Sequence, residues 1–253
     1  EYTTEILNLY QGIVGSYECL EECDKAEEAL REAVDLAREK GDDSLGSLLR
    51  QLGRLYFGHS KYEESIECHS EAMALPIVDE KHHIGIDYVN IGMSYQRLKN
   101  YEEAVRYEKI ALDKFYEDDV EPFWLVNIYG ELCESYVGLQ MADEILYYGQ
   151  RALDWWLMEN NYQKCWILKY YLAIGHRIKG DLEQALYFLK GARDLVVEHS
   201  RHPHDFLVDV DKEEGEILIM QGKVSAGQEL IRRSKNVQSI IDEVGTRHIL
   251  IDL

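Results

Sequence analysis

The feature that most constrains this chain is a small side chain that returns six times at nearly constant intervals. The small residues are Ala33, Ala72, Ala111, Ala152, Ala192 and Ser234, and the intervals between them are 39, 39, 41, 40 and 42 residues. A period near 40 is typical of chains built from one repeated helical unit, because a short unit cannot bury its apolar face alone and must stack on its neighbours. The spacing therefore predicts a repeat protein.

The repeated unit is clearest in the first half of the chain. One copy reads YVNIGMSY at 88–95 and then NYEEAVRYEKIAL at 100–112, and an earlier copy reads QLGRLY at 51–56 and then KYEESIECHSEA at 61–72. In both copies a glycine precedes an aromatic residue by three positions on a first helix, and two small residues lie seven apart on a second helix. Small residues of this kind allow two helices to cross closely.

These marks resemble the tetratricopeptide repeat. The period is longer than the usual length of about 34 residues and is similar to that of bacterial peptide-pheromone receptors, kinesin light chains and spindle-orientation adaptors. The resemblance implies an all-α fold, a right-handed α-solenoid of about six helical hairpins that forms a single domain over 1–253. The expected repeats are about 1–41, 42–80, 81–119, 120–160, 161–202 and 203–245. The expected helix pairs are 2–19/22–40, 43–58/61–75, 81–98/101–117, 120–139/141–158, 161–179/182–199 and 204–221/224–244.

The resemblance also implies a binding surface, because the first helices of such a solenoid line its concave side. Counting from the marks gives these candidate peptide-binding residues: Arg50, Gln51, Arg54, Asn90, Met93, Arg97, Asn127, Glu131, Tyr171 and Arg177. The same count places Phe57, Gln96, Trp124, Glu134, Tyr170 and Ile174 beside them. Amide side chains can hold a bound backbone, and arginine can clamp a carboxylate with two parallel hydrogen bonds. Asn90 directly precedes Ile-Gly, where related repeats carry an asparagine that contacts an extended peptide.

The charge balance limits the partners. The chain carries 27 basic and 48 acidic residues, a net charge of −21. Such a chain repels phosphate backbones and anionic membranes, so we expect no nucleic-acid binding by this segment and no membrane binding. The expected partner is another protein or an extended peptide, and a homodimer is compatible with the sequence.

Chemistry other than binding has little support. The five cysteines are scattered, an arrangement that indicates reduced thiols and a cytoplasmic location. His199, His202 and His204 form the one candidate zinc cluster, but they surround Pro203 in an expected loop, which is the simpler explanation for polar residues. No phosphate loop, nucleophile elbow or zinc-protease motif occurs. We therefore expect no metal, no cofactor and no enzymatic activity.

Two functions remain open at this point. The first is a scaffold or adaptor whose concave groove holds an extended segment of a partner. The alternative is a peptide-responsive regulatory sensor of the quorum-sensing type, with an effector domain outside this chain. Fold resemblance alone does not separate these functions.

Overall fold

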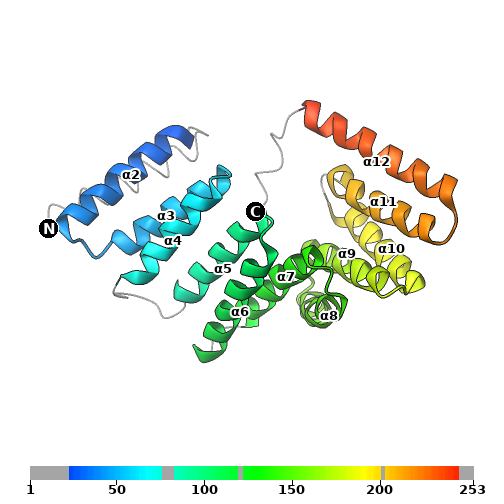
Figure 1. Cartoon of the computed structure of the whole chain (residues 1–253), viewed down its shortest axis with the longest axis horizontal. Coiled ribbons are helices and arrows are strands. Elements are labelled where there is room, and N and C mark those ends of the chain that lie inside the picture. Colours follow the sequence, from blue (N-terminus) through cyan, green and yellow to red (C-terminus); the bar gives the residue numbers. More distant parts are fainter. Residues whose placement is uncertain (1–22, 76–82, 119–121, 201–202, 245–253) are drawn as a thin grey trace. The chain divides into compact units, whose positions relative to one another are not determined.

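The structure is a computed structural model that describes residues 23–75, 83–118, 122–200 and 203–244, and every regular element in these ranges is an α-helix (Figure 1). The first helices of the hairpins are α3 (Leu45–Gly58), α5 (His83–Arg97), α7 (Pro122–Gly138), α9 (Tyr162–Ile178) and α11 (Pro203–Met220). The second helices are α2 (Cys23–Lys40), α4 (Tyr62–Ala74), α6 (Tyr101–Glu117), α8 (Ala142–Met158), α10 (Leu182–His199) and α12 (Val224–Val244). The expected helices thus form within two residues of their predicted ends, except that the helix expected over 2–19 lies outside the described residues.

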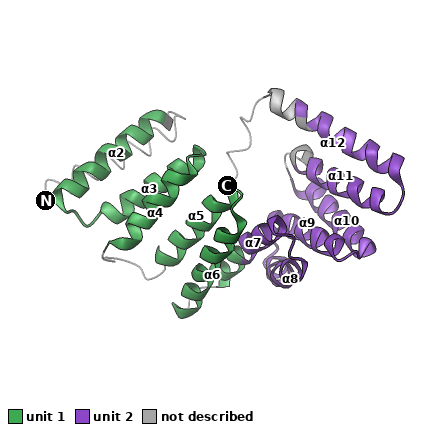
Figure 2. Ribbon diagram, in the orientation of Figure 1, with its two compact units in different colours: residues 1–128 green, residues 129–253 purple. Residues whose placement is uncertain are grey.

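The chain divides into two compact units, residues 1–128 and residues 129–253, and the division falls within α7 (Figure 2). In unit 1, α3 packs on α4, α4 on α5, and α5 on α6. In unit 2, α8 packs on α9, α9 on α10, α10 on α11, and α11 on α12. Each second helix that precedes another hairpin in its unit therefore also contacts the next first helix, as stacked hairpins require. The expectation of one domain over 1–253 stays a prediction.

The small-residue marks lie in the core, as predicted. All six of these residues are buried, and none exposes more than 3% of its surface. The helices α11 and α12 cross closely at two glycines: a Cβ atom added to Gly215 would lie 2.8 Å from the carbonyl oxygen of Gly227. A larger residue at either glycine would push these two helices apart.

Aromatic residues fill the space between the two helices of several hairpins. Tyr95 stacks on Tyr107 with a centroid distance of 5.4 Å, and Tyr136 stacks on Tyr148 at 5.9 Å. In the fifth pair the same positions hold His176 and Phe188, stacked at 5.3 Å. The partners are twelve residues apart in each case, so the aromatic mark of the first helix has a defined partner on the second.

The turns within the hairpins also repeat. Ser60, Lys99, Gln140, Gly180 and Gly222 all have positive φ, and each lies between the two helices of one pair. Since a left-handed residue reverses the chain tightly after a helix, these five positions give every described hairpin the same connection. Some second helices then begin with a side-chain cap: Asn100 accepts from the backbone N–H of Glu103, and Asp181 accepts from that of Gln184.

Candidate functional site

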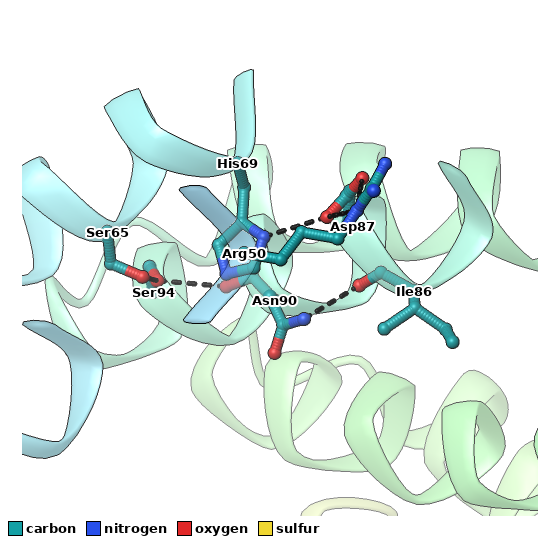
Figure 3. A network of polar contacts seen from close by, with 7 residues as sticks. All are labelled: Arg50, Ser65, His69, Ile86, Asp87, Asn90 and Ser94. Carbon is teal, nitrogen blue, oxygen red and sulfur yellow. Dashed lines mark hydrogen bonds and ion pairs between the residues drawn. The ribbon is translucent and has the colours of Figure 1, made fainter. Parts of the chain in front are cut away.

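The first helices of unit 1 carry a buried polar network (Figure 3). Asp87 of α5 is fully buried, and its two carboxylate oxygens accept hydrogen bonds of 3.1 and 2.8 Å from Nε of Arg50 on α3. His69 of α4 places its Nδ1 2.8 Å from Oδ1 of the same carboxylate. Three helices from two successive hairpins therefore meet at one carboxylate, and the ion pair and hydrogen bond compensate for its removal from water.

A second set of contacts continues along α5. Ser94 donates from Oγ to the carbonyl oxygen of Asn90 at 2.8 Å, and its Oγ also lies 3.3 Å from that of Ser65 on α4. Asn90 donates from Nδ2 to the carbonyl oxygen of Ile86 at 3.0 Å (Figure 3). These bonds fix the orientation of the Asn90 amide on the surface of α5.

The carboxylate, imidazole and hydroxyl groups of this network do not form a catalytic triad. A triad requires a hydroxyl within hydrogen-bond reach of the second imidazole nitrogen. Nε2 of His69 has no hydrogen-bond partner among the described residues, and only 1% of the side chain is exposed. A Cβ atom added to Gly53 would lie 2.8 Å from this nitrogen, so α3 covers it closely. The network thus holds helices together.

Contacts between residues 36 or 37 positions apart also join first helices in unit 2, as Arg50 and Asp87 do in unit 1. Tyr171 of α9 donates its hydroxyl to Oε2 of Glu134 on α7 at 3.2 Å. Arg177 of α9 forms an ion pair through Nε with Glu213 of α11 and approaches Glu216 at 4.0 Å. Burial raises the pKa of the Tyr171 hydroxyl well above its ordinary value. Burial also raises the pKa of the Glu213 carboxyl, although the ion pair with Arg177 opposes the shift.

These contacts correct part of the predicted binding surface. Arg50 and Arg177 are each only 20% exposed, and both are engaged with a buried carboxylate, so neither is the open carboxylate clamp that the sequence predicts. Tyr171 and Ile174 are buried, because both face the interior of unit 2. Gln96 is buried as well, and its Nε2 donates to Oε1 of Glu108 on α6 at 2.9 Å. The residue count from the marks did not separate exposed positions from those between helices.

The remaining candidates lie at the surface. In unit 1 they are Gln51, Arg54, Asn90, Met93, Arg97 and Asn127, which we call the unit 1 first-helix surface; Glu131 is a half-exposed residue of unit 2. Gln51 and Asn90 lie nine residues before the left-handed turn residues Ser60 and Lys99. They therefore occupy equivalent places on α3 and α5. Arg54 and Met93 follow them by three residues on the same helix faces.

Three amides of this surface share one arrangement. Gln51 donates from Nε2 to Oγ of Ser47 at 3.4 Å, and Asn127 donates from Nδ2 to the carbonyl oxygen of Phe123 at 2.7 Å. Asn90 makes the equivalent bond on α5. Each amide is thus held by a group four residues earlier on its own helix. No hydrogen bond to its oxygen is seen within the described chain. We call Gln51, Asn90 and Asn127 the anchored amides.

The candidate zinc cluster lies largely outside the described side chains. His199 stacks on Tyr162 with a centroid distance of 4.4 Å, while His202 lies outside the described residues and the side chain of His204 is not described. Over the described ranges, no group of three or more histidine, cysteine or acidic side chains is arranged to hold a metal ion. Cys68, Cys133 and Cys165 are buried and form no disulfide, and burial raises the pKa of the Cys68 thiol to about 11. Such a thiol is a weak nucleophile at neutral pH.

Sequence reasoning missed Asp87, His69 and Glu213, which join the hairpins. A signal for Asp87 was present, because it is the one acidic residue in the otherwise apolar start of α5, where a carboxylate needs a partner. Nothing comparable marked His69, which follows Cys68 in a polar stretch. Glu213 lies among several other acidic residues of α11, so the sequence did not distinguish it.

Comparisons with known proteins agree with this geometry. Residues 5–76 match the family model of the tetratricopeptide repeat. The match covers less than a third of the chain, and the fold of the described helices is that of tetratricopeptide-repeat proteins. No curated protein matches the sequence. None of the described helices has the length and apolar character needed to cross a membrane.

Solved structures with low sequence identity share the fold. The apo form of RapI is 16% identical with a TM-score of 0.67, and the match covers 94% of this chain and 85% of that protein. NprR in complex with its cognate peptide NprX is 12% identical with a TM-score of 0.67, covering 94% of this chain and 67% of that one. A signal-transduction ATPase with a tetratricopeptide-repeat sensor from Pyrococcus horikoshii is 18% identical with a TM-score of 0.74; the match covers 94% of this chain but 38% of that protein. These likenesses support the long-repeat form of the fold.

Proposed function

We propose that this chain is a non-catalytic binding module that holds a free peptide, or an extended segment of another protein, on the unit 1 first-helix surface. The observation that carries the proposal is the set of anchored amides, one on each of α3, α5 and α7. An extended backbone presents N–H groups at regular intervals. An amide oxygen can accept from such a group whatever the side chain beside it.

Orientation of the amides before binding favours this function. A free asparagine or glutamine side chain loses rotamer freedom when it binds, which costs up to about 1.5 kcal/mol for each side chain. Asn90 and Asn127 already hold one conformation through bonds to the carbonyl oxygens of Ile86 and Phe123. Less of this cost then falls on the binding step. The cytoplasm is the compartment we propose, because the three described buried cysteines form no disulfide.

The experiment begins with a displayed library of random peptides of about ten residues selected against the whole chain. The affinity of one recovered peptide is then measured by fluorescence anisotropy on wild type and on an Asn90→Ala/Asn127→Ala variant. We expect the variant to bind about tenfold more weakly, because each lost hydrogen bond contributes about 0.5–1.5 kcal/mol. Circular dichroism checks that helicity is unchanged.

Gln150→Ala is the matched control. Gln150 is also an amide held within its own helix, since it donates to Asp154, but it lies exposed on the second helix α8. Its substitution should leave the affinity unchanged. Equal affinities for wild type and the double variant would place the binding site elsewhere and reject the proposal.

A peptide-responsive sensor is the second candidate. The similarity to NprR, solved with its cognate peptide, and to an ATPase with a tetratricopeptide-repeat sensor favours it. A sensor must change its conformational equilibrium when the ligand binds. Small-angle X-ray scattering with and without the selected peptide separates the two functions: a changed radius of gyration supports the sensor, and an unchanged one supports the scaffold.

A further inference from the structure

Aromatic and acidic side chains meet between the first helices α9 and α11 of unit 2. Trp166 of α9 lies against Phe206 of α11 with a centroid distance of 4.4 Å. Tyr170 follows Trp166 by one helical turn, so both lie on the same side of α9. All three aromatic residues are half-buried and keep part of their surface accessible. The two helices therefore share an accessible aromatic surface.

Carboxylates of α11 lie near the Tyr170 hydroxyl. Burial raises the pKa of this hydroxyl, and the nearby charges of three carboxylates raise it further; these belong to Asp209, Glu213 and Glu216. Asp209 and Glu216 are accessible to solvent and lie seven residues apart, which places them two turns apart on one face of α11. We call Trp166, Tyr170, Phe206, Asp209 and Glu216 the α9–α11 strip.

Two basic residues only partly offset these carboxylates. Arg177 forms its ion pair with Glu213 and approaches Glu216 at 4.0 Å. Burial raises the carboxyl pKa of Asp209, and the charge of Lys212 opposes this shift. No ion pair to Asp209 is formed within the described part of the chain. Three carboxylates thus lie near two cations, and one of the accessible carboxylates has no close partner.

The two lysines of α9 lie away from the strip. A Cβ atom added to Gly191 of α10 would lie 2.9 Å from Nζ of Lys169, so this lysine extends toward α10. Lys164 lies six residues before Tyr170, which places it about 120° around the helix axis. Neither lysine therefore neutralises the accessible carboxylates of α11.

Other carboxylates of α11 differ from those of the strip, because they have a close partner. Asp211 and Glu214 each accept a hydrogen bond from Nη2 of Arg193 on α10, at 2.6 and 2.7 Å. This arginine compensates the acidic residues on the side of α11 that packs on α10. The side that carries Asp209 has no equivalent arginine within hydrogen-bond distance of that carboxylate.

We propose that the α9–α11 strip binds a lysine or arginine side chain of a partner protein or peptide. A cation is attracted to the face of an aromatic ring and to the carboxylates beside it. Long basic side chains also pack their methylene groups on apolar surface. Charge complementarity of this kind selects basic ligands. The inference goes beyond the proposed function, because it concerns unit 2 and does not depend on the unit 1 first-helix surface.

The test selects a displayed library of random ten-residue peptides on the whole chain, in parallel with an Asp209→Asn/Glu216→Gln variant. Both substitutions keep the shape of the side chain and leave Glu213 in place for its ion pair with Arg177. Peptides recovered on wild type should be enriched in lysine and arginine relative to the library, and the variant should lose most of this enrichment. One recovered basic peptide should bind the variant about fivefold more weakly. The difference should shrink between about 0.05 and 0.5 M NaCl, because salt screens exposed charges.

Glu183→Gln/Asp194→Asn is the matched control. Both residues are exposed on the second helix α10 of the same unit, and the double substitution removes the same amount of negative charge. Non-specific attraction of basic peptides to a chain of net charge −21 would weaken equally for both variants. The control should therefore keep the enrichment and the affinity of wild type.

The outcomes decide the inference. A loss confined to Asp209→Asn/Glu216→Gln, with circular dichroism and melting temperature showing that both variants fold, would support the strip. An equal loss in the two variants would show that only net charge attracts the peptide and would overturn the inference. A lack of basic enrichment on wild type, or basic peptides whose binding neither variant changes, would overturn it as well.

Discussion

At the scale of single residues, the important distinction lies between arginines that join helices and arginines that face solvent. Arg50 and Arg54 are four residues apart on α3, but only Arg50 reaches Asp87 of the next first helix. Taking a carboxylate fully out of water costs several kcal/mol unless opposite charge and hydrogen bonds compensate. Asp87 receives the opposite charge from Arg50 and a hydrogen-bond contact from His69. The stability of this buried carboxylate therefore depends strongly on the positions of these two side chains.

Replacing Asp87 with alanine should lower the free energy of unfolding by about 3 kcal/mol, because Arg50 and His69 would both lose the group that compensates their burial. The measurement is urea unfolding followed by circular dichroism. Asp113→Ala is the control, since Asp113 is exposed on α6 and surface substitutions usually change stability by less than about 0.5 kcal/mol. Equal midpoints for the two variants would show that the network contributes nothing to stability.

At the scale of elements, the hairpin turn is the structural feature that repeats. Each described hairpin reverses through one left-handed residue, and two of the five turns use glycine, at Gly180 and Gly222. Residues with a Cβ atom pay about 1–2 kcal/mol for this conformation. Ser60, Lys99 and Gln140 nevertheless adopt positive φ. At these positions the packing of the hairpins outweighs the backbone preference of the single residue.

Gly180→Ala should destabilise the chain by about 1 kcal/mol, because alanine rarely adopts the positive φ of 82° found there. No described atom lies within 4 Å of the added Cβ, so crowding does not contribute. Gly130→Ala is the matched comparison. It also adds a methyl group to open space, but inside α7, where alanine favours the helix by up to about 1 kcal/mol. The melting temperature should therefore fall for Gly180→Ala and rise for Gly130→Ala. Shifts of the same sign would contradict the role of backbone conformation.

At the scale of the whole molecule, excess negative charge opposes folding. A net charge of −21 concentrates like charges when the chain becomes compact. Exposed ion pairs such as Arg38 with Glu71 and Lys179 with Asp143 offset little of this repulsion, because they are solvated.

The melting temperature should consequently rise when NaCl is increased from about 0.02 to about 0.5 M, since screening weakens repulsion between charges more than a Debye length apart. Differential scanning calorimetry provides the measurement. A melting temperature that falls with salt would mean that the exposed ion pairs outweigh the repulsion.

The sequence by itself determined the repeat and the helices. The 39–42-residue spacing of small residues predicted the hairpins, and the six marks from Ala33 to Ser234 are all buried. These features are readable because they depend on local periodicity: a helix needs its own pattern of apolar residues, and a close crossing needs a small side chain at a fixed place in every unit. Counting from the same marks selected the amides at 51, 90 and 127, and their role in binding stays a prediction.

Only the tertiary structure decided which candidate side chains are available to a ligand. Arg50, Tyr171 and Arg177 find partners 36 or 37 residues away, and Gln96 finds Glu108 on the facing helix. The sequence alone does not distinguish a polar residue of a first helix that faces solvent from one that faces a neighbouring hairpin. The angle and depth at which the hairpins stack determine which carboxylate lies within reach, and that geometry arises from the packing of many side chains together.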